Sequence, residues 1–221
     1  MNKIKFHPSE ELLVGYASGD LNPALTVVVG THIDMCPRCR SVAEDIQNHM
    51  ATRELHQSAP LAEPDLNSML EHIMASESPI VRSAKVHEQV SLEGKVFKVP
   101  RSLGRHVDRL GPWSHMPGGL WRAPLELDAD SRMNLIYMQE NASLPEHTHR
   151  GSEATLVLNG VFNDEHDEYR DGDFIFLDEH KHHSPQTTDE DCLTLAYLDA
   201  PLQFTSGLAR LLNPFSSLFF R

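Results

Sequence analysis

The patterning of the chain changes once, from a first part typical of helices to a second part typical of short strands. Residues 8–75 carry apolar side chains at helical spacing, whereas from about residue 99 short apolar runs alternate with turn residues. A chain of 221 residues is long enough for two small domains. We therefore expect two domains of different fold class, at residues 1–76 and 99–221, joined by a polar linker at residues 77–98.

The first domain is predicted to be a small all-α unit of four helices. Capping residues, glycine and proline delimit the first three helices at about 9–19, 22–35 and 37–55. A polar loop precedes the fourth helix, whose apolar residues fall on one stripe: Leu66, Met69, Leu70, Ile73 and Met74. This stripe can pack within the domain or bind a partner protein.

The second domain is predicted to be all-β. Its apolar runs are four to six residues long and are separated by Gly-, Pro- and Asp-rich turns. The four clearest runs are Asn134–Met138, Ala154–Leu158, Phe174–Leu177 and Leu193–Leu198. Short strands at such intervals are typical of a sandwich or a barrel.

Three metal-ligand side chains lie close together at the junction of the second and third predicted helices. They are His32, Cys36 and Cys39, in the pattern His-x3-Cys-x2-Cys. A structural zinc ion needs about four nitrogen or sulfur ligands, so one more is wanted, and His7 is the best candidate. A small helical domain has little core of its own, so a zinc ion here would contribute much of its folding free energy.

The main alternative for the cysteine pair is a thioredoxin-like redox motif, because Cys36-Pro37-Arg38-Cys39 resembles one. A redox motif of that kind follows a buried strand in a βαβ unit, whereas this pair follows a helical stretch. Incidental thiols are a further alternative. The pattern favours zinc, and the odd count of three cysteines without an export signal argues against a disulfide framework.

A second ligand set lies in the all-β part. His147 and His149 are two residues apart, so on a strand both imidazoles point to the same face, and Glu153 can add a carboxylate. The spacing His-x-His-x3-Glu-x6-Gly, ending at Gly160, which we expect to supply a turn, matches the first motif of the cupin barrels. We therefore expect a cupin barrel that holds a metal ion.

The second cupin motif is looser. A histidine is expected about eleven residues after Gly172, and His183 fits that position, with His182 as second choice. Cupins usually have proline and glycine where this chain has Asp178 and His180. Three histidines and a carboxylate suit zinc or another divalent metal, so the metal cannot be identified from the ligands.

Two further features of the second domain leave alternatives open. Cys192 is expected to be a small core residue, with a sensing thiol as the alternative. The apolar tail at residues 202–221 has few basic residues, which argues against a membrane-surface helix. We expect the tail to dock on the barrel or to form a homodimer contact.

The pattern of residues around the amino-terminal ligands resembles that of a known family. The pattern His7-x-Ser9-x-x-Leu12-Leu13, followed by Thr31-His32-x3-Cys36-x2-Cys39, is similar to the zinc-binding anti-sigma domain and more narrowly to the ChrR-type anti-sigma factors. The resemblance implies one zinc ion on these four ligands, an extracytoplasmic-function sigma factor as partner, and a cupin that senses singlet oxygen and related oxidants rather than catalysing a reaction. The fourth helix would then belong to the sigma-binding surface.

The charge agrees with a protein partner. A net charge of −13 repels phosphate backbones, so direct nucleic-acid binding is not expected, and it suits a basic partner. No apolar run approaches the ~20 residues of a membrane span, and we expect a cytoplasmic protein. The alternatives are a metal-dependent cupin dioxygenase with a zinc-stabilised helical appendage, and a metal-storage or redox module.

Overall fold

The amino-terminal helices begin and end where the capping residues predict. The computed structural model describes residues 3–56, 66–76, 85–127, 132–149, 151–178, 181–205 and 213. Ser9 caps the first helix by accepting a hydrogen bond from the Leu12 amide. Asn22 caps the second helix by accepting a hydrogen bond from the Leu25 amide. The four helices are α1 (Glu10–Ser18), α2 (Pro23–Met35), α3 (Pro37–Leu55) and α4 (Leu66–Ala75). The prediction of a helical part followed by a cupin-like β part is confirmed.

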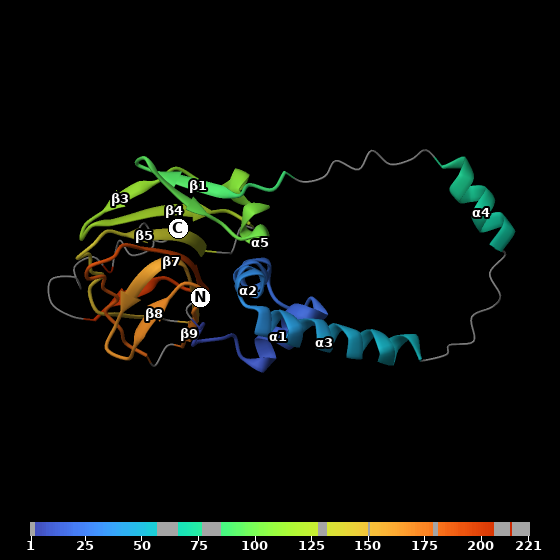
Figure 1. Ribbon diagram of the computed structural model, residues 1–221, viewed down its shortest axis with the longest axis horizontal. Coiled ribbons are helices and arrows are strands. Elements are labelled where there is room, and N and C mark those ends of the chain that lie inside the picture. The colour runs from blue at the N-terminus through green and yellow to red at the C-terminus, as the bar shows by residue number, and fades with distance from the viewer. Residues whose placement is uncertain are drawn as a thin grey trace.

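The helix α2 connects the helical part to the β part (Figure 1). It packs against α1 and α3 on one side and against β7, β10 and the short helix α5 (Arg101–Gly104) on the other. Its residues Ala24, Val28 and Val29 are completely buried, and the Asn22 amide donates a hydrogen bond to the Tyr197 hydroxyl. The two parts therefore share one hydrophobic core.

A β-hairpin lies inside the segment predicted as a linker. Its strands are β1 (Gln89–Leu92) and β2 (Lys95–Lys98), and Val90, Leu92 and Phe97 are buried in the core. The linker prediction therefore misses two strands. The segment is polar because only one face of the hairpin is buried, so its apolar residues alternate with exposed ones.

The β part is an antiparallel assembly whose strands close around an interior (Figure 1). The main sheet has the order β3-β4-β5-β10-β7-β8, with β9 also paired to β7, and β6 pairs with β11 beside it. Its strands are β3 (Ser114–Met116), β4 (Leu120–Leu125), β5 (Arg132–Met138), β6 (His147–His149), β7 (Glu153–Asn163), β8 (Glu168–Arg170), β9 (Phe174–Leu177), β10 (Cys192–Leu198) and β11 (Leu202–Phe204). A 3-10 turn, η1 (Val107–Arg109), precedes β3. Each of the four predicted apolar runs lies within a strand.

Gly160 does not form the turn that the motif predicts. It lies within β7 at φ 88°, where a side-chain Cβ would stand 1.9 Å from the carbonyl oxygen of Asp191. The register between β10 and β7 shifts close to this point, between Leu193 and Thr194. Glycine is therefore needed for a bulge and a close approach of two backbones, not for a chain reversal.

The stripe on α4 is exposed. No residue of this helix is buried, and Leu66 and Ile73 are 70% and 64% exposed. Packing of the stripe within the helical part is therefore not observed among the described residues. In those residues no single helix is long and apolar enough to cross a membrane. Only α1 and α2 taken together have the length and apolar composition of a span, and they are bent by 110° at the break between them.

Two candidate metal centres

The structure brings His7, His32, Cys36 and Cys39 together at the base of the helical part. Their ligand atoms all lie within 4.8 Å of one another. His32 comes from the last turn of α2, Cys36 stands at the break between α2 and α3, and Cys39 is in the first turn of α3. His7 arrives from the extended segment before α1. This arrangement ties the start of the chain to the α2–α3 junction.

The spacing of these atoms fits a tetrahedral zinc ion. Zinc–nitrogen distances of about 2.0 Å and zinc–sulfur distances of about 2.3 Å in a tetrahedron separate nitrogen from sulfur by about 3.5 Å. The Cys39 sulfur lies 3.3 Å from His32 Nε2 and 3.4 Å from His7 Nδ1, and the Cys36 sulfur lies 3.5 Å from His7 Nδ1. These three separations are therefore close to those that one shared zinc ion requires, and all four donors lie within 4.8 Å of one another.

The electrostatics of this site also favour a cation. Burial lowers the pKa of His32 to about 4, so its imidazole is neutral and can ligate at neutral pH. Burial and the neighbouring Cys36 raise the pKa of Cys39 to about 12, so a pair of thiolates here needs a positive charge between them. The Cys39 amide donates to the Cys36 sulfur at the start of α3, which stabilises a thiolate at that helix end.

A second group of ligand atoms lies inside the barrel. The atoms of His147, Glu153 and His183 all lie within 4.8 Å of one another, and the three side chains are buried. His147 comes from β6 and Glu153 from the start of β7, while His183 pairs with His147 through backbone hydrogen bonds. Nδ1 of His147 donates to the Pro145 carbonyl, so Nε2 is the ring nitrogen that would ligate a metal ion.

The carboxylates around His183 fix its ring. Its Nε2 lies 3.9 Å from Glu153 Oε2, and its Nδ1 lies 3.5 Å from Asp164 Oδ2. Burial disfavours the charged imidazole, but Asp164 and Glu153 outweigh burial and raise the pKa of His183. Glu153 is held in turn by the Thr155 hydroxyl, at 2.5 Å. Metal-ligating histidines commonly have such a partner on the second ring nitrogen.

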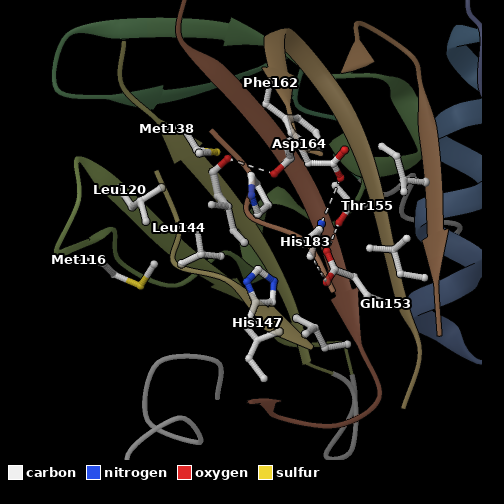
Figure 2. Close-up of a pocket in the computed structure, with 18 residues that line it drawn as sticks. Met116, Leu120, Met138, Leu144, His147, Glu153, Thr155, Phe162, Asp164 and His183 are labelled. Atoms are coloured by element: carbon white, nitrogen blue, oxygen red, sulfur yellow. Dashed lines mark hydrogen bonds and ion pairs between the residues drawn. The ribbon is translucent and has the colours of Figure 1, made fainter. Parts of the chain in front are cut away.

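An apolar cavity of about 50 Å³ adjoins this group. Figure 2 shows His147, Glu153 and His183 gathered on one side of it, with apolar side chains opposite. Its apolar lining includes Met116, Leu120, Met138, Leu144 and Phe162. A polar ligand group at the wall of a small apolar chamber can bind a metal ion and admit a small molecule beside it.

The other predicted side chains have different positions. His149 is on β6, but its side chain lies outside the described part of the chain, as does His180. His182, the second choice for the motif, is half-exposed and its Nδ1 lies 3.8 Å from Glu146, so His183 is the residue that faces the cavity. Of the tail, residues 202–204 form β11, and beyond residue 205 only Asn213 is described.

Cys192 is a core residue, whereas Asp164 is a residue of the site that the sequence did not indicate. Cys192 is 1% exposed, and burial raises the pKa of its thiol. Asp164 is a buried acid that contacts a predicted ligand, yet it follows an Asn in a polar run, Asn163–Asp167, that resembles an ordinary loop. Nothing in that run marks one acid as buried, because its burial depends on the fold of the whole barrel.

Comparison with known proteins identifies relatives over both parts of the chain. A family model described as the ChrR cupin-like domain matches residues 106–202. The anti-sigma-E factor ChrR of Cereibacter sphaeroides is 33% identical over 218 residues, which covers 96% of this chain and 98% of that protein. ChrR in the crystal structure of Rhodobacter sphaeroides SigE in complex with the anti-sigma ChrR has a TM-score of 0.70 and 28% identity, over 89% of this chain and 99% of that one. With both the helical part and the cupin covered, the chain belongs to the ChrR family of anti-sigma factors.

Proposed function

We propose that this protein is an anti-sigma factor that binds an extracytoplasmic-function sigma factor through its helical part. The support from relatives is that the Cereibacter protein is named an anti-sigma-E factor and that the similar solved structure is a complex with SigE. The observation that carries the proposal here is the His7, His32, Cys36 and Cys39 cluster. A zinc ion on these donors would join three segments of the sigma-binding part.

The exposed stripe of α4 is proposed as part of the sigma-binding surface. Leu66, Leu70, Ile73 and Met74 lie on one helical face, and each is more than half exposed. Helices that present apolar residues at this spacing are a common means of binding a partner protein. The net charge of −13 favours association with the basic surfaces by which a sigma factor contacts DNA, and the proposed location is the cytoplasm.

The barrel is proposed to be the sensory half rather than an enzyme. Its buried group of His147, Glu153 and His183, completed by His149, is proposed to hold zinc or another divalent metal. The adjoining cavity has space for a molecule of a few atoms, which suits a small oxidant reaching the metal ligands. An oxidative signal received there would weaken the hold on the sigma factor.

The test is direct capture. The chain is co-expressed with each extracytoplasmic-function sigma factor of its own genome, and the complexes are isolated by size-exclusion chromatography. We expect a stable complex with one of them, and inhibition of transcription by that sigma factor. Failure to bind any of them would contradict the proposal, and oxygen uptake by the iron-loaded protein with an organic substrate would favour a dioxygenase instead.

A further inference from the structure

The turn between β8 and β9 contacts the amino-terminal ligand cluster. The carbonyl oxygen of Gly172 lies 2.8 Å from Nδ1 of His32, and both residues are buried. Nδ1–H of His32 therefore donates to the barrel, which fixes the ring and directs Nε2 towards the Cys39 sulfur at 3.3 Å. One ligand of the helical part is thus oriented by a residue of the cupin.

The same turn holds the segment that carries His7. Asp173, only 3% exposed, accepts hydrogen bonds at Oδ1 from the backbone amides of Lys5 and Phe6, at 2.7 and 3.0 Å. Its Oδ2 accepts from the Arg170 amide at 2.9 Å. The next amide, of Phe174, donates to the Phe6 carbonyl at 3.1 Å. Phe6, which immediately precedes His7, is therefore hydrogen-bonded at both its amide and its carbonyl.

A chain of contacts continues from this segment to the cavity. The Phe6 ring lies 5.0 Å from the ring of Tyr169, which lies 4.9 Å from the ring of Phe162 at the cavity wall. The Tyr169 hydroxyl donates to Asp164 Oδ1 at 3.4 Å, and Asp164 Oδ2 faces His183 Nδ1 at 3.5 Å. Phe6, Tyr169 and Asp164 thus connect the neighbour of His7 to His183.

We propose that Asp173 is a positioning residue for the amino-terminal metal site, and that the contact of Phe6 with Tyr169 and Asp164 couples this site to the cupin ligand group. The proposal rests on the proposed function in one respect, that both groups hold metal. Coupling of this kind is reciprocal. If metal at one site changes the metal affinity of the other by some factor, metal at the other site changes the affinity of the first by that factor. Rearrangement of His183 would therefore alter the retention of metal by His7 and His32, which links the sensor to the sigma-binding part.

The positioning role is tested on the full-length protein loaded with Co²⁺. Only the cysteine-containing site gives sulfur-to-cobalt charge-transfer absorption, so its decay in excess chelator reports metal loss from that site alone. Asp173→Ala should lose cobalt at least tenfold faster than the wild type, with shifted ligand-field bands. Asp173→Asn keeps an oxygen for the Lys5 and Phe6 amides and should restore most of the retention. The matched control is Asp171→Ala, because Asp171 lies in the same turn but accepts from Gly160, on β7.

A purely structural role for Asp173 predicts another outcome. It would lower the melting temperature of Asp173→Ala without changing the cobalt spectrum or the rate of cobalt loss, and that result would overturn the positioning role. Binding of the sigma factor is measured separately on the wild type, so failure of the proposed function is distinguishable from failure of this inference.

The coupling is tested by a double-mutant cycle. The rate of cobalt loss from the cysteine site is compared between wild type and His183→Ala, and again in a Tyr169→Leu background. We expect His183→Ala to change the rate at least threefold in the wild-type background and less than 1.5-fold when Tyr169 is replaced. Equal effects of His183→Ala in the two backgrounds, or no effect in either, would overturn the coupling.

Discussion

Asp164 and His183 face each other inside the barrel, with Oδ2 of the aspartate 3.5 Å from Nδ1 of the histidine. Among the described residues that Oδ2 has no hydrogen bond of good geometry, although the atom is buried. The other oxygen, Oδ1, accepts from the amides of His166 and Asp167, at 2.8 and 3.1 Å. The backbone therefore fixes the carboxylate, and the carboxylate fixes the orientation of the ring that points to Glu153.

This relationship predicts that Asp164→Asn weakens metal binding in the barrel. The amide keeps one oxygen for the two backbone N–H groups but presents an N–H where His183 needs an acceptor. Loss of such a partner typically costs about 10–100-fold in metal affinity. Competition with a chromophoric chelator measures the change, and Asp189→Asn, an exposed acid, is the control. Equal affinity of Asp164→Asn and wild type would contradict the role of Asp164.

Replacing the barrel ligands should separate sensing from binding. His147→Ala, His149→Ala and Glu153→Ala are each expected to repress the sigma factor normally but to prevent induction by an oxidant, because the ligand group lies in the sensory half. A transcriptional reporter measures both states. His182→Ala is the matched control, since this neighbouring histidine is half-exposed and should induce normally. Normal induction in the three ligand variants would exclude the barrel from signalling.

A charge on the α4 stripe should weaken the complex without destabilising the chain. Ile73 is 64% exposed, so Ile73→Asp should change the free energy of unfolding by less than about 0.5 kcal/mol. At a buried interface it should reduce sigma affinity at least tenfold, which is about 1.4 kcal/mol. Calorimetry measures both quantities, with Glu71→Lys on the same helix as a charge-changing control. Unchanged affinity of Ile73→Asp would remove α4 from the interface.

Cys192 should be dispensable for the response to an oxidant. Its thiol is buried and its pKa is raised by burial, so it has little of the thiolate form that reacts with oxidants. Cys192→Ala should therefore induce the reporter as the wild type does, and iodoacetamide should not label Cys192 in the native protein. Loss of induction together with rapid labelling would identify Cys192 as a sensor and contradict this expectation.

The helices and the principal strands could be predicted from local signals. Ser9 and Asn22 begin helices by accepting a hydrogen bond from an amide three residues later, and Pro37 favours a helix start through its fixed φ. The sequence around these residues is therefore sufficient. The four ligands of the amino-terminal cluster were predicted from spacing and from the family resemblance, although binding of a metal there stays a prediction. The structure adds three nitrogen–sulfur distances within this cluster, which are close to those around a tetrahedral zinc ion.

Features that depend on contacts between distant segments could not be predicted. The β1–β2 hairpin is polar on one face, so its two strands resemble a linker until the core beneath them is known. Gly160 is needed because Asp191, on a distant segment, approaches its backbone. Asp173 likewise acts on residues 5 and 6, which precede it by more than 160 positions.

We expect a metal ion at the amino-terminal site to build the surface that binds the sigma factor. The most direct measurement is metal content together with sigma affinity for the double variant Cys36→Ser and Cys39→Ser, against wild type and Cys192→Ala. We predict that the double variant loses the amino-terminal metal, retains the metal of the barrel and no longer binds the sigma factor, while Cys192→Ala matches the wild type. A double variant that lacks this metal and still captures the sigma factor at wild-type strength would contradict the account.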